Sequence, residues 1–274
     1  MESIERYEQK YLLSLAQVAQ IKASIHPFVK ADQNSKNGAY TVLSLYLDGI
    51  DRPFYQANEN QVSERLKLRI RTYGSDAIFL EIKRKVRGMI WKSRVCLNQS
   101  QYQALFQPHL AATTRRERQG ILQGLSLKQK QTLEEFLWWK DRYQASPHYW
   151  VGYEREGFQS PDGDYARVTF DYRVKARPSN DYRISSQLID DYENLWKRVD
   201  YAHALKSKQA DVIMELKSEK RIPMWMSTLT HKHDLEVIGV SKYVLSIDSS
   251  DAIGQLYRNQ LQASSQSTFN SVDS

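Results

Sequence analysis

Basic and apolar residues alternate in the segment Arg65-Leu-Lys-Leu-Arg-Ile-Arg71. Because the side chains of a β-strand point alternately to its two faces, the four basic residues share one face and the apolar residues share the other. A row of guanidinium and ammonium groups suits phosphate, which accepts several charge-assisted hydrogen bonds at once. The segment therefore predicts a strand with one face for the core and one face for a polyanion.

Other predicted strands repeat this division and place a carboxylate among the cations of the charged face. An unpaired buried charge costs several kcal/mol, so charged faces that turn inward need counter-charges. A polyanionic ligand and a divalent metal held by the carboxylates would supply them. The carboxylates, each with the basic residues on the same predicted strand face, are Glu81 with Lys83, Asp171 with Arg167 and Arg173, and Glu215 with Lys217.

The positive charge of the protein is local. The formal net charge is +7, yet residues 65–94 alone hold ten basic and two acidic side chains, so the other residues together carry a charge of −1. Such a patch attracts nucleic acid, phosphorylated ligands or acidic lipid surfaces. A solvated sheet face is the alternative interpretation of the same pattern.

Composition and missing motifs exclude several classes of protein. The chain has 274 residues, 41% of them hydrophobic, and one cysteine, so it has a sizeable core and no internal disulfide. Its apolar runs are too short for a bilayer span, and its first residues lack a signal-peptide pattern, so we expect a soluble, cytoplasmic protein. Neither a P-loop, nor G-x-G-x-x-G, nor H-E-x-x-H occurs.

The elements that carry the charged faces are strands joined by short turns, which favours antiparallel pairing. We expect an α+β fold in which the sheet closes into an antiparallel β-barrel, with the charged faces lining a tunnel and helices packed on the outside. Strands are predicted at 6–13, 40–48, 65–71, 78–87, 90–97, 148–158, 165–174, 211–218 and 240–247. Helices are predicted at 14–25, 101–110, 127–143 and 223–231, with a charged helix and a loop over 185–207.

Eight short segments follow one another in order across roughly residues 4–247. Together they resemble the VTC (vacuolar transporter chaperone) polyphosphate polymerase domain, which belongs to the triphosphate tunnel metalloenzymes and is related to the CYTH proteins. The segments are Arg6-Tyr-Glu-Gln-Lys-Tyr, Ser44-Leu-Tyr-Leu-Asp48, Arg65-Leu-Lys-Leu-Arg-Ile-Arg-Thr-Tyr-Gly74, Leu80-Glu-Ile-Lys-Arg-Lys85, Tyr153-Glu-Arg155, Arg167-Val-Thr-Phe-Asp171, Met214-Glu-Leu-Lys217 and Ser241-Lys-Tyr243.

The resemblance implies a role for individual residues. Glu215 matches the metal-binding glutamate of the family, with Mn²⁺ or Mg²⁺ as its cofactor. Glu8, Glu81 and Lys217 share the expected inner faces, and no role is assigned to them. The residues implied in catalysis are Lys10, Arg69, Arg71, Lys83, Arg155, Arg167 and Lys242. The residues implied in phosphate binding are these seven together with Lys92, Arg94, Tyr153 and Ser241.

The resemblance further implies a metal-dependent polymerase that transfers the γ-phosphoryl group of ATP to a growing polyphosphate chain. Its partners are ATP and polyphosphate, without nucleic acid, whose backbone the interleaved carboxylates would repel, and without insertion into a membrane. A tripolyphosphate or nucleoside triphosphate hydrolase of the same fold and a non-catalytic polyphosphate-binding module remain alternatives. We expect one tunnel domain over 1–262, with a helical insertion at about 99–145, and a disordered tail over 263–274.

Overall fold

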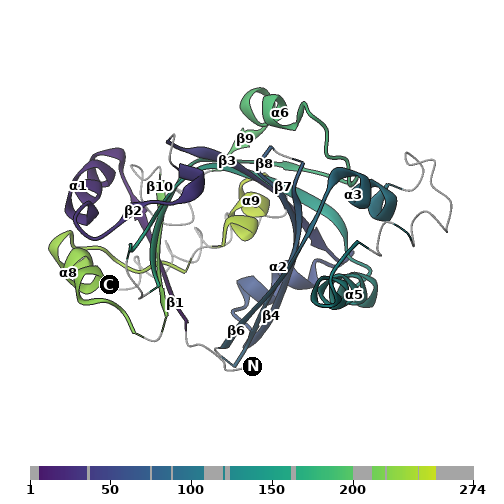
Figure 1. Cartoon of the computed structure of the whole chain (residues 1–274), viewed down its shortest axis with the longest axis horizontal. Helices are drawn as coiled ribbons and strands as arrows, with labels where there is room; N and C mark the ends of the chain where they lie inside the picture. Colours follow the sequence, from purple (N-terminus) through teal and green to yellow (C-terminus); the bar gives the residue numbers. More distant parts are fainter. Residues whose placement is uncertain are drawn as a thin grey trace, which may run out of the picture.

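The computed structural model describes residues 6–35, 38–74, 76–87, 89–107, 120, 124–161, 165–199, 212–219, 221–239 and 241–250. The predicted tail at 263–274 lies outside them. The described residues form an α+β structure around one curved antiparallel sheet (Figure 1). Its strands are β1 (Arg6–Leu13), β2 (Lys30–Ala31), β3 (Tyr40–Asp48), β4 (Glu64–Thr72), β5 (Ile78–Val86), β6 (Met89–Leu97), β7 (Ser146–Gln159), β8 (Ala166–Pro178), β9 (Lys197–Arg198) and β10 (Val212–Glu219).

The sheet is curved but open along one side. Its main strands follow the order β1–β10–β8–β7–β3–β4–β5–β6, while β2 pairs with β7 and β9 pairs with β8. Within the described part of the chain, no strand pairing joins the two end strands β1 and β6. The sequence predicted a closed barrel, and this closure is not present. Period-two alternation predicts which face of a strand is buried, but it does not show whether two distant edges pair.

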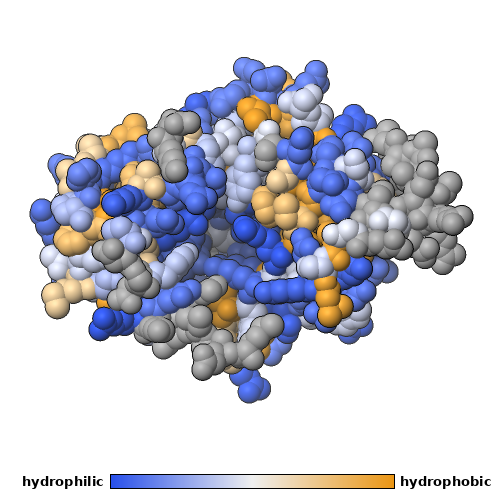
Figure 2. Space-filling model, viewed as in Figure 1, coloured by the Kyte–Doolittle hydropathy of each residue, from blue (hydrophilic) through white to orange (hydrophobic). Residues whose placement is uncertain are grey.

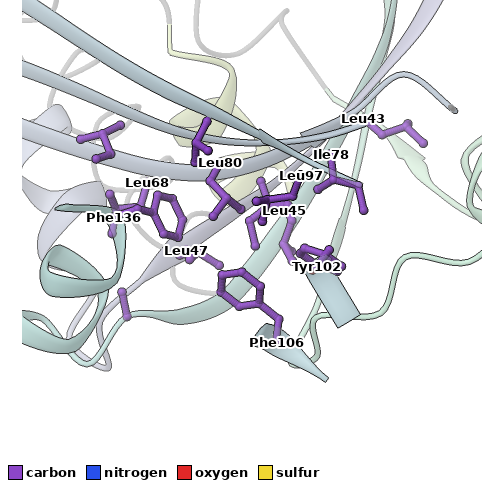
Figure 3. Packing of buried hydrophobic residues seen from close by; sticks show 14 of the residues in the cluster. Leu43, Leu45, Leu47, Leu68, Ile78, Leu80, Leu97, Tyr102, Phe106 and Phe136 are labelled. Carbon is purple, nitrogen blue, oxygen red and sulfur yellow. The ribbon is translucent and has the colours of Figure 1, made fainter. Parts of the chain in front are cut away.

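The two faces of β4 are divided as the alternation predicts. Leu66, Leu68 and Ile70 are buried in a core on the outer face, where helices cover the sheet. Burial of this apolar row on one side directs the basic row to the other side, because a strand has only two faces. Figure 3 shows residues of this core packed together: Leu43, Leu45, Leu47, Leu68, Ile78, Leu80, Leu97, Tyr102, Phe106 and Phe136.

Helices cover two separate outer cores. One core lies under α3, α5 and α6 on the side of β3–β6, and the other lies under α1 and α8 on the side of β1, β10 and β8 (Figure 1). Three of these helices begin at capping boxes. Ser14 with Gln17 and Ser126 with Gln129 are as their spacing predicts, and Asn98 with Gln101 forms the third. None of the described helices is both long and apolar enough to cross a lipid bilayer. The helices are α1 (Leu15–Ile25), α2 (Pro53–Glu59), α3 (Gln99–Phe106), α5 (Leu127–Arg142), α6 (Leu188–Asn194), α8 (Met224–Lys232) and α9 (Lys242–Ser250).

The last element differs from the sequence prediction. A strand was expected over 240–247, but Lys242–Ser250 forms helix α9, which lies within the concave side of the sheet (Figure 1). Tyr243, Leu245 and Ile247 are all buried there with residues of β3, β7 and β8. A short apolar run that is buried on several sides has no clear period, and so it does not distinguish a strand from a helix.

Two contacts hold α9 to the segment that follows β3. The hydroxyl of Tyr243 donates a hydrogen bond of 2.6 Å to Asp48 Oδ2, and the hydroxyl of Tyr55 donates one of 2.7 Å to Asp248. Asp48 also accepts hydrogen bonds from the backbone N–H groups of Gly49, Phe54 and Tyr55. Asp48 therefore joins the start of α2 to the helix inside the sheet.

We expect Tyr243→Phe to lower the free energy of unfolding by about 1.5–3 kcal/mol, the usual contribution of a hydrogen bond to a charged group. The ring and its packing are kept, and Asp48 keeps its backbone donors. Urea unfolding measures the effect. Tyr143→Phe is the matched control, since the Tyr143 ring is 39% exposed and its hydroxyl bonds to no described residue. Equal stability of the two variants would contradict the role of this contact.

Candidate functional site

The concave face of the sheet lines a cavity of about 510 Å³, called here the central pocket. Figure 2 shows a hollow near the middle of the viewed face, with hydrophilic residues around it. Strands β1, β3, β4, β5, β6, β7 and β10 and the start of α9 all contribute side chains to it. Its charged and polar lining residues are Glu8, Lys10, Tyr46, Lys67, Arg69, Arg71, Glu81, Lys83, Lys92, Ser93, Arg94, Tyr153, Arg155, Tyr165, Glu215, Lys217, Ser241 and Lys242.

Cations dominate this lining. Ten of the residues are basic and three are acidic, so the described lining carries a formal surplus of seven positive charges. Because like charges at close range repel one another, this lining carries an electrostatic cost that an anion would relieve. The three carboxylates, Glu8, Glu81 and Glu215, divide the cations into three groups.

Glu81 organises the first group, the paired arginines of β4. Arg69 Nε donates a hydrogen bond of 2.5 Å to Glu81 Oε2, and Arg71 Nη1 lies 3.7 Å from the same oxygen. Arg71 also donates to Ser44 Oγ of β3 and to the Tyr153 hydroxyl of β7. Burial alone would raise the pKa of Glu81, but the two arginines lower it to about 2. The guanidinium groups are therefore fixed in place by partners on three strands.

Glu8 organises the second group and spans the open side of the sheet. Its carboxylate on β1 lies 3.3 Å from the ammonium groups of Lys83 on β5 and of Lys92 on β6, and 3.7 Å from Lys10. Burial, with help from Lys10 and Lys92, lowers the pKa of Lys83 to about 7 although Glu8 opposes this shift. Lys83 is therefore a cation that can lose its proton near neutral pH.

Glu215 organises the third and most deeply buried group. It accepts hydrogen bonds of 2.5 Å from Lys217 and of 2.9 Å from Lys242, and Arg155 lies 3.6 Å away. Asp171 on the neighbouring strand β8 binds the Arg155 guanidinium through both oxygens, at 2.6 and 2.8 Å, and Lys242 at 2.6 Å. These cations outweigh burial and hold the pKa of Glu215 well below its usual value. Both carboxylates in this network are therefore ionised.

The same network positions the first residues of α9. Ser241 accepts a hydrogen bond from Lys67 Nζ at 2.9 Å, and the next residue, Lys242, is fixed between Asp171 and Glu215. The Lys242 ammonium group lies 4.9 Å from the centre of the Tyr153 ring, a cation–π distance. The two residues predicted from the Ser241-Lys-Tyr243 segment thus reach the pocket from a helix start rather than from a strand.

The carboxylates provide a limited set of oxygens for a divalent cation. Among the described residues, no group of three or more His, Cys, Asp or Glu side chains is arranged to hold a metal. Glu8 and Glu215 nevertheless lie on paired strands, where Glu8 is opposite Lys217 and Glu215 is opposite Lys10. Mg²⁺ is commonly held by one or two carboxylates with the remaining ligands from water and phosphate. The donor set fits such a cation only when a phosphate ligand completes it.

Most residues implied by the resemblance meet in the central pocket, and one does not line it. The Arg167 guanidinium donates a hydrogen bond of 2.6 Å to Asp32, and neither residue belongs to the lining. The roles of the implied residues in binding or catalysis remain predictions. The implied residues that line the pocket are Lys10, Arg69, Arg71, Lys83, Lys92, Arg94, Tyr153, Arg155, Glu215, Ser241 and Lys242.

Three carboxylate pairings expected from the sequence are different in the structure. Glu81 pairs with Arg69 rather than with Lys83, and Asp171 pairs with neither Arg167 nor Arg173. Asp171 pairs with Arg155 and Lys242, whereas Arg173 is half exposed and pairs with Glu154 and Glu193. A register shift in β7 between Gly152 and Glu154, and a φ of 49° at Arg173, interrupt the alternation of β8. The interruption turns Arg173 away from the face that carries Asp171.

Besides Glu8, Glu81 and Lys217, four charged or polar lining residues were not assigned a role from the sequence: Tyr46, Lys67, Ser93 and Tyr165. Lys67 shares its strand face with Arg69 and Arg71, so the alternation of β4 already contained the signal for it. Tyr46 accepts a hydrogen bond of 3.3 Å from Arg69, and the nearby arginines lower the pKa of its hydroxyl despite burial. No comparable signal marks Tyr46, because a tyrosine in a strand is as often a core residue.

The VTC domain family model matches residues 5–250, a range that includes every described residue. The chain belongs to the VTC domain family. No curated protein matches the chain in sequence. Among solved structures, the chain is similar to the PH1819 protein from Pyrococcus horikoshii OT3, with 12% sequence identity, a TM-score of 0.43, and coverage of 89% of this chain and 99% of that one. The VTC domain is associated with polyphosphate.

The titration of Lys83 predicts a pH-dependent affinity for inorganic tripolyphosphate. Below its pKa of about 7, Lys83 is a cation that attracts phosphate, and above this pKa the attraction is lost. Affinity should therefore fall between about pH 6 and about pH 8, by up to about tenfold for the loss of one charge-assisted contact. The Lys83→Arg variant keeps its positive charge over this pH range, so the decrease in affinity that is due to Lys83 should disappear.

Isothermal titration calorimetry at fixed ionic strength measures tripolyphosphate affinity against pH for the wild type and for Lys83→Arg. The ratio of the two affinities at each pH removes the effect of protonation of the ligand itself. Lys128→Arg, on the exposed outer helix α5, is the matched control and should keep the wild-type profile. Parallel profiles for the wild type and Lys83→Arg would exclude Lys83 as the titrating group.

Proposed function

We propose that this VTC domain protein is a metal-dependent polyphosphate polymerase that transfers the γ-phosphoryl group of ATP to a phosphate chain in the central pocket. The observation that carries the proposal is the concave lining of ten cations around three carboxylates. Membership of the VTC family supports polyphosphate as the anion. ATP and polyphosphate are the proposed partners, and a cytoplasmic location, where ATP is supplied, is part of the proposal.

The geometry favours a chain of phosphates over a nucleic acid. A cavity of about 510 Å³ is in the range of small-molecule sites and is too small for a duplex. A phosphate chain carries a negative charge on every unit, which matches cations that project from several strands at short intervals. Glu81 contacts both Arg69 and Arg71, which lie two positions apart on β4. Their adjacent guanidinium groups can each donate two hydrogen bonds to neighbouring phosphate groups.

Phosphoryl transfer requires in-line positioning and stabilisation of charge more than a protein nucleophile. In the proposed reaction, Arg69 and Arg71 bind and orient the phosphates, and Lys83 neutralises charge that moves to the bridging oxygen. Arg155 and Lys242 are fixed by Asp171 and Glu215, so they need no rearrangement when charge develops nearby. Preorganised charges of this kind are the main source of rate enhancement in such sites.

Glu215, with Glu8 beside it on the paired strand, is the proposed holder of Mn²⁺ or Mg²⁺. A bound divalent cation supplies charge neutralisation on the phosphate oxygens. Lys217 contacts Glu215 Oε2 at 2.5 Å and Lys242 contacts Oε1 at 2.9 Å, so a cation held by Glu215 would compete with one of these ammonium groups. The released ammonium group would then be available to phosphate.

The proposal is tested with purified protein, ATP and Mn²⁺, by sizing the products on a polyacrylamide gel. We expect phosphate chains longer than three units together with ADP. Release of inorganic phosphate or pyrophosphate without chains would identify a hydrolase of the same fold. Tight binding of polyphosphate with no turnover would identify a binding module, and either result would refute the polymerase.

A carboxylate-to-amide exchange separates catalysis from binding. Glu215→Gln keeps the shape of the side chain but removes the charge that a hard divalent cation prefers. We expect turnover to fall by about two orders of magnitude or more, the effect of losing one electrostatic contact to the transition state. Polyphosphate affinity should persist or rise, because a negative charge beside the ligand is gone.

Turnover measured against metal concentration decides the role of Glu215. The matched control is Glu134→Gln on the exposed side of α5, which should behave as the wild type. If Glu215 only neutralises Lys217 and Lys242, the variant will lose stability and keep the saturating rate. Equal saturating rates for Glu215→Gln and the wild type would remove Glu215 from the mechanism.

A further inference from the structure

A small cavity of about 110 Å³ lies beside the central pocket, between the end strands β1 and β6, and is called here the side pocket. The two cavities meet at four side chains that belong to both linings: Glu8, Lys92, Tyr165 and Lys217. The other residues of the side pocket come from β1, β6 and the end of β10. They are Tyr7, Ile90, Ser218 and Glu219.

The charges of the side pocket are balanced, unlike those of the central pocket. Its lining holds two cations, Lys92 and Lys217, and two carboxylates, Glu8 and Glu219. The lining of the central pocket instead has seven more basic than acidic residues. Because a phosphate group is bound best where positive charge is in surplus, the side pocket is poorly suited to phosphate. It suits an uncharged part of a ligand whose phosphates lie in the central pocket.

Tyr165 stands at the junction of the two cavities. It lies two positions before Arg167, directly ahead of β8, and its carbonyl oxygen accepts a hydrogen bond of 3.3 Å from the N–H group of Glu219 at the end of β10. The residue is 46% exposed, and within the part of the chain that the structure describes its ring makes no stacking or cation–π contact. The backbone is thus held by a neighbouring strand while the ring remains available to a ligand. An aromatic ring in this setting can stack on a nucleobase.

The rest of the side pocket has the chemistry of a nucleoside site. Ile90 adds apolar surface beside Tyr165, and the Glu219 carboxylate adds hydrogen-bond acceptors. Ribose hydroxyl groups and the exocyclic amine of adenine are donors, and carboxylates accept hydrogen bonds from both kinds of group. Inorganic polyphosphate has neither. Because Tyr165 is exposed, a base stacked on its ring needs to enter the cavity only along one edge.

We propose that the side pocket is the nucleoside subsite for ATP, in which the adenine ring stacks on Tyr165 and a hydroxyl or amine group of the nucleoside donates a hydrogen bond to Glu219. The triphosphate of the same molecule lies among the cations of the central pocket. The choice of ATP rests on the proposed function. The subsite lets the protein distinguish the phosphoryl donor from the phosphate chain, because the chain has no base to stack.

Calorimetric titration at one fixed salt concentration tests the proposal with two ligands. One is the non-hydrolysable ATP analogue with an imido group between its β- and γ-phosphorus atoms, and the other is inorganic tripolyphosphate. We expect Tyr165→Ala to bind the analogue about tenfold more weakly, because stacking on one base is lost, and to bind tripolyphosphate within about twofold of the wild type. Tyr165→Phe is the matched control, which keeps the ring and should bind both ligands as the wild type does.

Several results would overturn the nucleoside subsite. Equal weakening of both ligands in Tyr165→Ala would place Tyr165 in phosphate binding, and unchanged affinity for both would place the base elsewhere. Weakening in Tyr165→Phe would assign the effect to the hydroxyl group rather than to stacking. In these three cases the proposed function would stand, since the products that the wild type forms from ATP test it separately. A wild type that binds tripolyphosphate but not the analogue would refute ATP as the donor and the subsite together.

Discussion

Mutual repulsion among the cations of the concave face is the constraint on which the rest of the structure depends. A sheet that gathers ten basic side chains around one pocket folds only if other interactions exceed this repulsion. Two apolar cores on the convex side provide that excess, with α1 and α8 over one half and α3, α5 and α6 over the other. On the concave side, Glu8, Glu81 and Glu215 each neutralise a separate group of cations, so repulsion remains where no carboxylate is placed.

The arginines and lysines of the pocket perform different physical tasks. Arg69, Arg71 and Arg155 are fixed by hydrogen bonds to carboxylates and hydroxyls on neighbouring strands, and they keep their charge at every relevant pH. Lys67 and Lys83 have lowered pKa values, because burial and neighbouring cations disfavour their charged form. The arginines thus define the geometry of the site, while the charge of these lysines depends on their surroundings.

The sequence was most informative where one period described a whole strand. The alternation of β4 predicted both the core row and the row of cations, and the antiparallel meander of β4, β5 and β6 is confirmed. It was least informative where a single local event changed the pattern. The bulge beside Arg173 reversed the face of that residue, and burial on several sides concealed the helical period of α9. The open edge was also not predictable, since pairing between distant strands leaves no mark in either segment.

The open side between β1 and β6 has a consequence for how a polymer can reach the pocket. In a closed barrel the wall is continuous, so a long chain can enter only by threading one of its ends. Here the two edges are connected through Glu8, which contacts Lys83 and Lys92 across the gap, and a cavity of about 110 Å³ lies at this junction. Ion pairs between side chains separate far more readily than a ladder of backbone hydrogen bonds. Separation of these contacts would turn the central pocket into a groove, and the middle of a long chain could then enter it from the side.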